Sequence, residues 1–216
     1  MSVFLLSDDI AFPPPHLAEE DGLLAVGGDL SEERILTAYS HGIFPWYSEG
    51  SPILWWSPDP RLVLFPDELK VSRSLQQCLN KRIFNVTINR AFGQVIRACA
   101  DVSRRGQSGT WITDEMITAY TRLYHAGHAH SVESWHNGEL VGGLYGIIMG
   151  KIFFGESMFS TMSNASKAAL AELVMQLRQK DFKLIDCQVR TAHLVSLGAR
   201  EMPRTAFLEI LKTALQ

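Results

Sequence analysis

The segment LIDCQV at residues 184–189 constrains the fold more than any other part of the chain. It has the length and apolar character of a buried strand, yet it contains Asp186 and Gln188. Because side chains alternate along a strand, we expect Leu184, Asp186 and Gln188 on one face and the intervening residues on the other. A buried carboxylate needs partners, so this pair indicates a functional site. The alternative is a polar pair that only caps a neighbouring loop.

A second candidate strand lies upstream. Residues 151–159, KIFFGESMF, are mostly apolar and carry Gly155 and Glu156 toward the far end. We expect the Glu156 carboxylate to be half-buried. Two strands of a sheet would then each present an acid, which favours a site over an isolated structural pair.

Length and composition are those of an ordinary globular protein. With 216 residues, 46% of them hydrophobic and 20% charged, the chain can bury a full core as one domain or as a small domain beside a medium one. No apolar stretch is long enough to cross a membrane, and residues 1–10 carry acids instead of a signal-peptide pattern. Three cysteines without a C-x-x-C pair fit reduced thiols. We therefore expect a cytosolic protein with no membrane partner.

Charge is distributed unevenly along the chain, whose net charge is −3. Residues 1–60 hold one basic residue and ten acids, whereas residues 61–105 hold nine basic residues and three acids. Local positive charge attracts phosphate whatever the total charge is. The basic segment therefore predicts either a phosphate-contacting surface or a solvated helix face rich in lysine and arginine.

The chain divides near residue 60. Residues 1–60 are rich in proline and glycine and contain one clear helix, which begins at Ser31 and runs to about His41 before Gly42. We expect a small loop-rich N-terminal domain over 1–60 and a larger domain over 61–216, where strand and helix patterns alternate. Strands are expected at 61–65, 84–88, 130–135, 139–149, 151–158 and 184–189, and helices at 72–81, 91–100, 114–125, 165–179 and 204–215.

The order of these elements predicts an α+β fold. A hairpin, a strand, a long helix and a strand with polar residues form one plan of acyltransferase, in which a mixed sheet splays and an acylated donor binds between the strands. Ser163 or Asn164 is available to cap the long helix, whose N-terminus can hold a phosphate. The glycine-rich loop of coenzyme A-dependent acetyltransferases is missing there, since SMFSTM stands at 157–162. A coenzyme A donor is therefore disfavoured.

Six ordered motifs carry a family resemblance. They are GLLAVGGDL (22–30), GIFPW (42–46), LWWSPDPR (54–61), GTWIT (109–113), FGESMF (154–159) and LIDCQ (184–188). Together they resemble the leucyl/phenylalanyl-tRNA–protein transferase family over nearly the whole chain. The resemblance implies a bacterial cytosolic enzyme that moves Leu or Phe, with Met as a further candidate, from aminoacyl-tRNA to the N-terminal Arg or Lys of a protein, marking it for proteolysis. It also implies an acetyltransferase-like (GNAT-like) C-terminal domain beside a smaller N-terminal one.

The implied reaction needs neither ATP nor a metal, because the ester that joins the amino acid to tRNA is already activated. The resemblance places Gln188 nearest the attacking amine as a hydrogen-bond acceptor, with Asp186 orienting it, so these are the candidate catalytic residues. His193, close by in sequence, is a further candidate. We expect no cofactor and no metal site, since the histidines of the HAGHAH run at 125–130 have no cysteine or further acid at ligand spacing.

Substrate contacts are assigned by residue type and by the resemblance. Glu156 suits the basic side chain of the acceptor through a charge-assisted hydrogen bond, unless it pairs with a structural arginine. The candidates for stacking on the 3′-adenosine of the tRNA are Trp46, Trp111, Tyr39 and Tyr120. The candidate aminoacyl pocket comprises Phe153, Met158, Leu170, Leu173, Leu177, Ile185 and Leu144. The candidate contacts to tRNA phosphates are Arg73, Lys81 and Arg82.

Three functions stay open at this point. The first is a tRNA-dependent aminoacyltransferase, for which we expect a monomer. The second is an N-acyltransferase that uses a coenzyme A thioester, which the missing loop disfavours. The third is a non-catalytic tRNA-binding module, in which a buried Asp186 and Gln188 would have no purpose.

Overall fold

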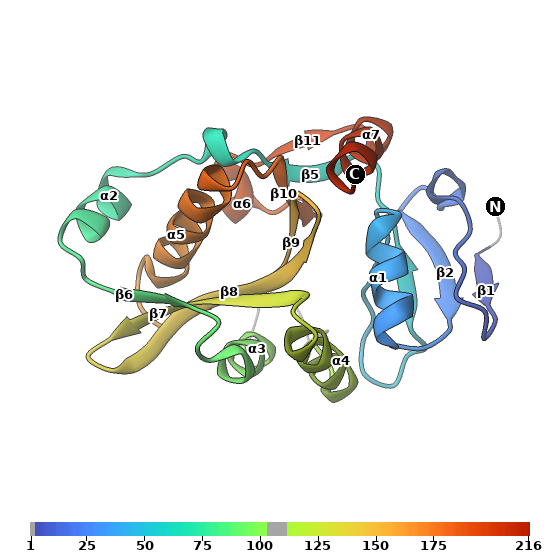
Figure 1. Ribbon diagram of the computed structural model, residues 1–216, viewed down its shortest axis with the longest axis horizontal. Helices are drawn as coiled ribbons and strands as arrows, with labels where there is room; N and C mark the ends of the chain where they lie inside the picture. Colours follow the sequence, from blue (N-terminus) through green and yellow to red (C-terminus); the bar gives the residue numbers. More distant parts are fainter. Residues whose placement is uncertain (1–2, 103–111) are drawn as a thin grey trace.

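The computed structural model describes residues 3–102 and 112–216. Their strands form two sheets, one of four strands and one of seven. In Figure 1 the small sheet and helix α1 (Glu32–Ser40) lie at one end of the molecule, and the large sheet with its helices makes up the rest. Among the described residues, no helix is both long and apolar enough to cross a membrane.

The small sheet is built from residues before position 57. Helix α1 begins as predicted, because the Ser31 hydroxyl accepts a hydrogen bond from the Arg34 N–H at 3.3 Å. In sheet order the strands are β1 (Phe4–Leu6), β2 (Leu23–Gly27), β4 (Leu54–Trp56) and β3 (Phe44–Pro45).

The large sheet is mixed. Neighbouring strands are antiparallel except for β9 and β10, which are parallel. This arrangement, with helices between the strands, confirms the predicted α+β class. In sheet order the strands are β11 (Arg200–Met202), β5 (Arg61–Leu64), β10 (Leu184–Gln188), β9 (Ile152–Ser160), β8 (Glu139–Met149), β7 (Ala129–His136) and β6 (Asn85–Ile88).

Helices cover both faces of the large sheet (Figure 1). Phe154 and Leu184 belong to the core cluster that contains α3 and α4, whereas their neighbours Phe153 and Ile185 belong to the cluster that contains α5. The alternation of a strand thus sends adjacent side chains into different cores. The helices are α2 (Arg73–Asn80), α3 (Phe92–Ala100), α4 (Asp114–His125), α5 (Ala165–Gln179), α6 (Ala192–Ser196) and α7 (Arg204–Ala214), with short 3-10 turns η1 (Pro15–Leu17) and η2 (Pro66–Glu68).

The parallel strands β9 and β10 separate part-way along their length. They pair only where residues 184–186 lie beside residues 152–154. Beyond that point β9 stays with β8 as far as Ser160, whereas β10 stays with β5. Two central strands therefore diverge, as the expected acyltransferase plan requires.

The N-terminus of α5 differs from the prediction. Asn164 occupies the cap position, but its φ is 69° and its side chain makes no capping hydrogen bond. A capping side chain normally extends from a β-region backbone, so the left-handed conformation directs the amide elsewhere. Ser160 Oγ instead accepts a hydrogen bond from the Ser166 N–H at 3.3 Å. Asn164 is therefore the N-cap residue, as one of the two expected candidates, but its side chain makes no capping hydrogen bond.

The N-terminal part is joined to the larger part by a shared core. Tyr39 and Trp55 belong to the same buried cluster as Phe154 and Phe207. The Tyr39 ring lies 5.0 Å from the Phe154 ring, edge to face. A domain boundary at residue 60 stays a prediction, while this packing brings residues that follow α1 to the diverging strands.

Candidate active site

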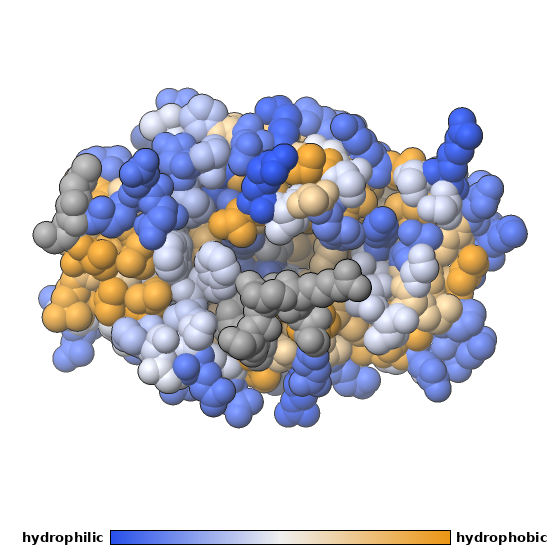
Figure 2. Space-filling model, turned by 180° about the vertical axis from the view of Figure 1, so that it is seen from behind, coloured by the Kyte–Doolittle hydropathy of each residue, from blue (hydrophilic) through white to orange (hydrophobic). Residues whose placement is uncertain are grey.

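A cavity of about 360 Å³ opens where β9 and β10 diverge. Its walls come from strands β5, β8, β9 and β10, helices α5 and α6 and the segment after α1. The molecular surface in Figure 2 is hollowed near the middle of the face shown. The predicted pocket residues that line the cavity are Leu144, Phe153, Met158, Leu170, Leu173 and Ile185.

Leu177 is the predicted pocket residue that does not line the cavity. It is 3% exposed and packs in the core cluster that contains Leu173, one turn earlier on α5. Residues four apart lie on the same helix face, so the sequence pattern could not separate the cavity wall from the core beneath it.

Glu156 occupies a bulge of β9. On β8, Tyr145 pairs with Ser157 and Gly146 pairs with Gly155, so Glu156 is an extra residue with no partner across the ladder. Bulges of this kind re-aim a side chain and are frequent beside active sites. Glu156 consequently contacts the cavity from the strand that also supplies its apolar wall.

Two tyrosines hold the Glu156 carboxylate. It accepts hydrogen bonds from the Tyr39 hydroxyl at 2.6 Å and from the Tyr120 hydroxyl at 3.1 Å, and the two hydroxyls lie 2.7 Å apart. Burial raises the pKa of Glu156 to about 7, although both hydroxyl donors act in the opposite direction. Glu156 forms no salt bridge with any described residue, so the alternative of a structural arginine partner is not seen.

An irregularity in β10 turns Gln188 toward the cavity. Asp186 pairs with Val63 of β5 and Gln188 pairs with Leu62, which leaves Cys187 as an extra residue. Gln188 also has a left-handed backbone, with φ of 55°. The prediction that Asp186 and Gln188 share a face is therefore wrong, because the extra residue breaks the alternation. Gln188 lines the cavity, and Asp186 does not.

Asp186 is fully buried and paired with Arg61. The Nε and Nη2 atoms of Arg61 donate to the two carboxylate oxygens of Asp186 at 2.8 and 2.7 Å. Asp186 Oδ1 also accepts the Gln188 backbone N–H at 3.0 Å. Asp186 thus contacts Gln188 through the main chain. Arg61, counted above in the basic segment, is 0% exposed and does not contribute to a phosphate-binding surface.

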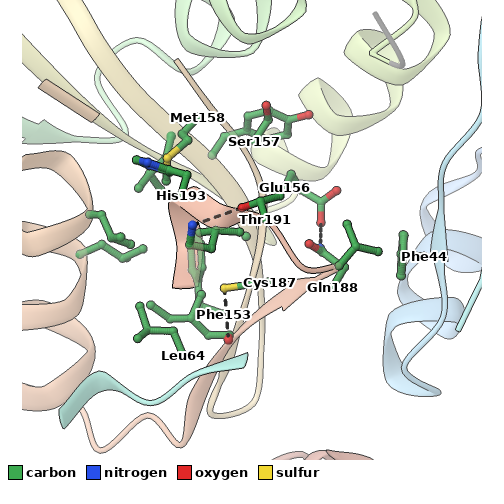
Figure 3. Close-up of a pocket in the computed structure, with 18 of the residues that line it drawn as sticks. Phe44, Leu64, Phe153, Glu156, Ser157, Met158, Cys187, Gln188, Thr191 and His193 are labelled. Atoms are coloured by element: carbon green, nitrogen blue, oxygen red, sulfur yellow. Dashed lines mark hydrogen bonds between the residues drawn. The ribbon is translucent and has the colours of Figure 1, made fainter. Parts of the chain in front are cut away.

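The side chain of Gln188 lies beside Glu156. Gln188 Nε2 is 3.5 Å from Glu156 Oε1, as the dashed line in Figure 3 marks. With Nε2 turned toward the carboxylate, Gln188 Oε1 is left to accept a hydrogen bond from a bound group. Figure 3 shows this polar pair between Phe44 on one side and Met158 with His193 on the other.

The predicted adenosine-stacking residues fall into three groups. Tyr39 and Tyr120 are both 0% exposed, so neither ring can stack on a base, and this prediction is wrong. Their hydroxyls donate hydrogen bonds to Glu156, so both tyrosines can be buried without an unpaired hydroxyl group. Trp46 lines the cavity, with its ring 5.8 Å from that of Trp56. Trp111 lies outside the described residues.

The remaining candidates have simple placements. His193 of α6 lines the cavity, and its pKa is lowered by burial and by the positive charge of Lys167. Arg73, Lys81 and Arg82, on α2 and just after it, are exposed. Over residues 3–102 and 112–216, no three His, Cys, Asp or Glu side chains gather as a metal site would require.

Several cavity residues were not predicted. Phe44 belongs to the same GIFPW motif as Trp46, so the motif itself was the available signal. Leu64 and Leu194 resemble any core leucine in sequence. Arg61, behind the cavity wall, has one signal in the sequence. It begins the otherwise apolar run RLVL, and a charged residue in a buried strand needs a partner.

Comparison with known proteins identifies similar sequences over nearly the whole chain. A family model described as leucyl/phenylalanyl-tRNA protein transferase matches residues 63–212, and the model of the N-terminal domain of that family matches residues 28–59. The leucyl/phenylalanyl-tRNA–protein transferase of Syntrophobacter fumaroxidans is 62% identical over 211 residues, covering 98% of this chain and 90% of that protein. The one from Flavobacterium johnsoniae is 54% identical over 211 residues, covering 98% and 100%.

Solved structures with some likeness include an aminoglycoside acetyltransferase from an uncultured soil metagenomic sample. It is 14% identical, with a TM-score of 0.40, and the match covers 54% of this chain and 84% of that one. Another is L-PGS from Bacillus licheniformis, at 10% identity and a TM-score of 0.43, covering 78% and 54%.

Proposed function

Because this chain belongs to the leucyl/phenylalanyl-tRNA–protein transferase family, we propose that its cavity holds the Leu or Phe side chain of a charged tRNA while Gln188 receives the acceptor amine. The chain is a transferase that moves an aminoacyl group from tRNA to protein. The observation that carries the proposal is the cavity between β9 and β10, apolar on most sides and polar at Glu156 and Gln188.

The reaction is an aminolysis. The lone pair of the acceptor nitrogen attacks the carbonyl carbon of the aminoacyl ester, a C–N bond forms, and the C–O bond to the terminal ribose breaks. The amine proton leaves with the ribose oxygen or goes to water. Since an ester is replaced by an amide, the transfer is downhill, and the protein has to position the two substrates and stabilise the developing charge.

Gln188 positions the nucleophile. Its Oε1 accepts a hydrogen bond from the incoming α-amine and aims the nitrogen lone pair at the ester. A neutral amide is a weak base, so Gln188 orients the amine and does not keep its proton. The contact of Nε2 with Glu156 at 3.5 Å supports this orientation.

Glu156 selects the acceptor. A carboxylate at the cavity that has no salt-bridge partner among the described residues suits, when ionised, the guanidinium or ammonium group of an N-terminal Arg or Lys. Tyr39 and Tyr120 hold both carboxylate oxygens in place before the acceptor binds. Proteins that begin with Arg or Lys are therefore the proposed acceptors, and the transferred residue marks them for degradation.

The donor side chain occupies the apolar wall. Leu170 and Leu173 of α5 line the cavity together with Phe153 and Met158 of β9. A flexible thioether adapts to aromatic or aliphatic guests, which fits transfer of both Phe and Leu and extends to Met. Trp46 at the cavity is the proposed stacking partner of the 3′-adenosine.

The proposed compartment follows from where the donor substrate is made. Aminoacyl-tRNA is made in the cytoplasm, so the enzyme acts there. The proposed active form is a monomer, in which the cavity residues of a single chain contact both substrates.

The test is transfer of labelled Leu or Phe from charged tRNA to a short peptide with an N-terminal Arg. Product is expected with N-terminal Arg or Lys and not with N-terminal Ala or an acetylated N-terminus. No product with charged tRNA still bound would contradict the proposal and indicate a binding protein. Acylation by a coenzyme A thioester in place of charged tRNA would also contradict it.

A further inference from the structure

Arg61 is a fully buried cation directly behind the cavity wall. Its guanidinium makes two parallel hydrogen bonds to Asp186, at 2.8 and 2.7 Å. The rings of Phe44 and Phe207 lie 4.8 and 4.7 Å from its central carbon. Phe44 itself lines the cavity. Arg61 thus joins the N-terminal part, α7 and β10 at one point.

Gln188 needs support from its surroundings. A residue other than glycine is strained in the left-handed region, and Gln188 has φ of 55°. Its backbone N–H donates to Asp186 Oδ1 at 3.0 Å. Asp186 Oδ1 also accepts a hydrogen bond from the Arg61 Nε–H. The guanidinium therefore holds in place the oxygen to which the Gln188 backbone N–H donates.

We propose that Arg61 is a positioning residue for aminoacyl transfer: it locks Asp186, which holds the Gln188 backbone in its left-handed turn and keeps the Gln188 side chain in the cavity. The inference rests on the proposed function, because it assumes that Gln188 receives the acceptor amine. Asp186, expected from the sequence to orient Gln188, is fully buried and does not line the cavity, so it acts on Gln188 through the main chain.

The geometry depends on the arginine fork. Lysine carries a similar charge but cannot donate two parallel hydrogen bonds from one rigid plane, so it would leave Asp186 free to rotate. Arg61→Lys therefore separates positioning from charge. Arg200 offers a control with the same hydrogen-bond geometry at an exposed site. Its guanidinium donates two hydrogen bonds to the Glu68 carboxylate, at 2.9 and 3.3 Å, and lies 4.5 Å from the Phe65 ring.

The experiment compares Arg61→Lys and Arg200→Lys in the wild-type and Gln188→Ala backgrounds. In the wild-type background, Arg61→Lys is expected to lower kcat for Phe transfer by about tenfold or more, with little change in KM for charged tRNA, while Arg200→Lys has no effect. In the Gln188→Ala background, Arg61→Lys is expected to change kcat by less than about twofold, because the group that it positions is gone.

Circular dichroism and tRNA binding establish that each variant is folded. If Arg61→Lys does not fold, Asp186→Asn provides the second variant with the same expectation in both backgrounds. Equal losses of kcat in the two backgrounds, or full activity of Arg61→Lys, would overturn the inference and leave the proposed function intact. An inactive wild-type enzyme would instead overturn the proposed function.

Discussion

At the scale of single residues, the chemistry of Glu156 depends strongly on its surroundings. Burial raises its pKa to about 7, while Tyr39 and Tyr120 donate hydrogen bonds that favour the charged form. The carboxyl group is therefore ionised above about pH 7 and neutral below it. Only the ionised form attracts the cationic side chain of an acceptor, so acceptor binding is strongest on the alkaline side.

Glu156→Gln tests this role. The variant is expected to raise KM for an N-terminal Arg peptide by about 10- to 100-fold, since a hydrogen bond to a charged group contributes about 1.5–3 kcal/mol. In the wild-type enzyme, KM for the acceptor should rise as pH falls through about 7, and in Glu156→Gln the part of this dependence that comes from Glu156 should be lost, which leaves that of the acceptor α-amine. Steady-state kinetics with peptide at several pH values measures both effects. An unchanged acceptor KM with a reduced kcat would assign Glu156 to the chemical step instead.

Local residue types revealed part of the site before the fold was known. Glu156 and Gln188 were found because a polar residue in an apolar run is unusual and needs a purpose. The ion pair between Arg61 and Asp186 cannot be predicted from local residue types, because the two residues are separated by 125 positions. The sequence predicts Tyr39 and Tyr120 as base-stacking residues and not as partners of Glu156, because a sequence does not reveal which aromatic rings are buried.

At the scale of elements, the divergence of β9 and β10 creates the cavity, and α5 closes it. Leu173 of α5 lines the cavity, whereas Leu177, one turn later, packs beneath it. Both side chains are buried, so both contribute to stability, but only Leu173 is expected to contact the donor.

Leu173→Ala and Leu177→Ala form a matched pair. Each should destabilise the protein by about 2–5 kcal/mol, because a large buried side chain is lost. Leu173→Ala should also shift the ratio of kcat/KM for Phe over Leu by about tenfold toward Phe, because the wider cavity favours the larger guest. Leu177→Ala should leave that ratio unchanged. Thermal unfolding and competition between the two charged tRNAs measure these effects, and equal ratios in the two variants would contradict the assigned wall.

Elements with a long or clear hydrophobic pattern were predictable, and the short strands of the N-terminal part and β11 were not. Helices α4 and α5 have the predicted bounds, because many apolar residues recur at helical spacing. The short strands β1 to β4 and β11 lie among proline and glycine residues and owe their conformation to pairing with distant strands. The bulges at Glu156 and Cys187 follow from register between strands, which a period-two pattern does not contain.

At the scale of the whole molecule, the exposed basic residues of the α2 region are the proposed contact to the tRNA backbone. The chain is acidic overall, so a local cluster must supply the attraction. Replacing Arg73, Lys81 and Arg82 with Ala is expected to weaken tRNA binding and to lower the slope of log affinity against log salt by about 2 to 3. Binding titrations at several salt concentrations measure the slope.

Three other exposed lysines provide the control. Lys180 and Lys183 precede β10, at the end of the strand away from Gln188, and Lys212 lies near the end of α7. Replacing these three with Ala changes the net charge equally and should leave the salt slope unchanged. Equal slopes in both triple variants would show that total charge, and not the α2 region, governs binding.

The central claim is that transfer takes place at the cavity where β9 and β10 diverge, with Gln188 orienting the amine. The most direct measurement is the single-turnover rate of Phe transfer from charged tRNA to an N-terminal Arg peptide by wild type and by Gln188→Ala. A loss of about 100-fold or more is expected, with tRNA binding unchanged, because a polar group at the reacting centre is removed. A variant that transfers at the wild-type rate would contradict the account.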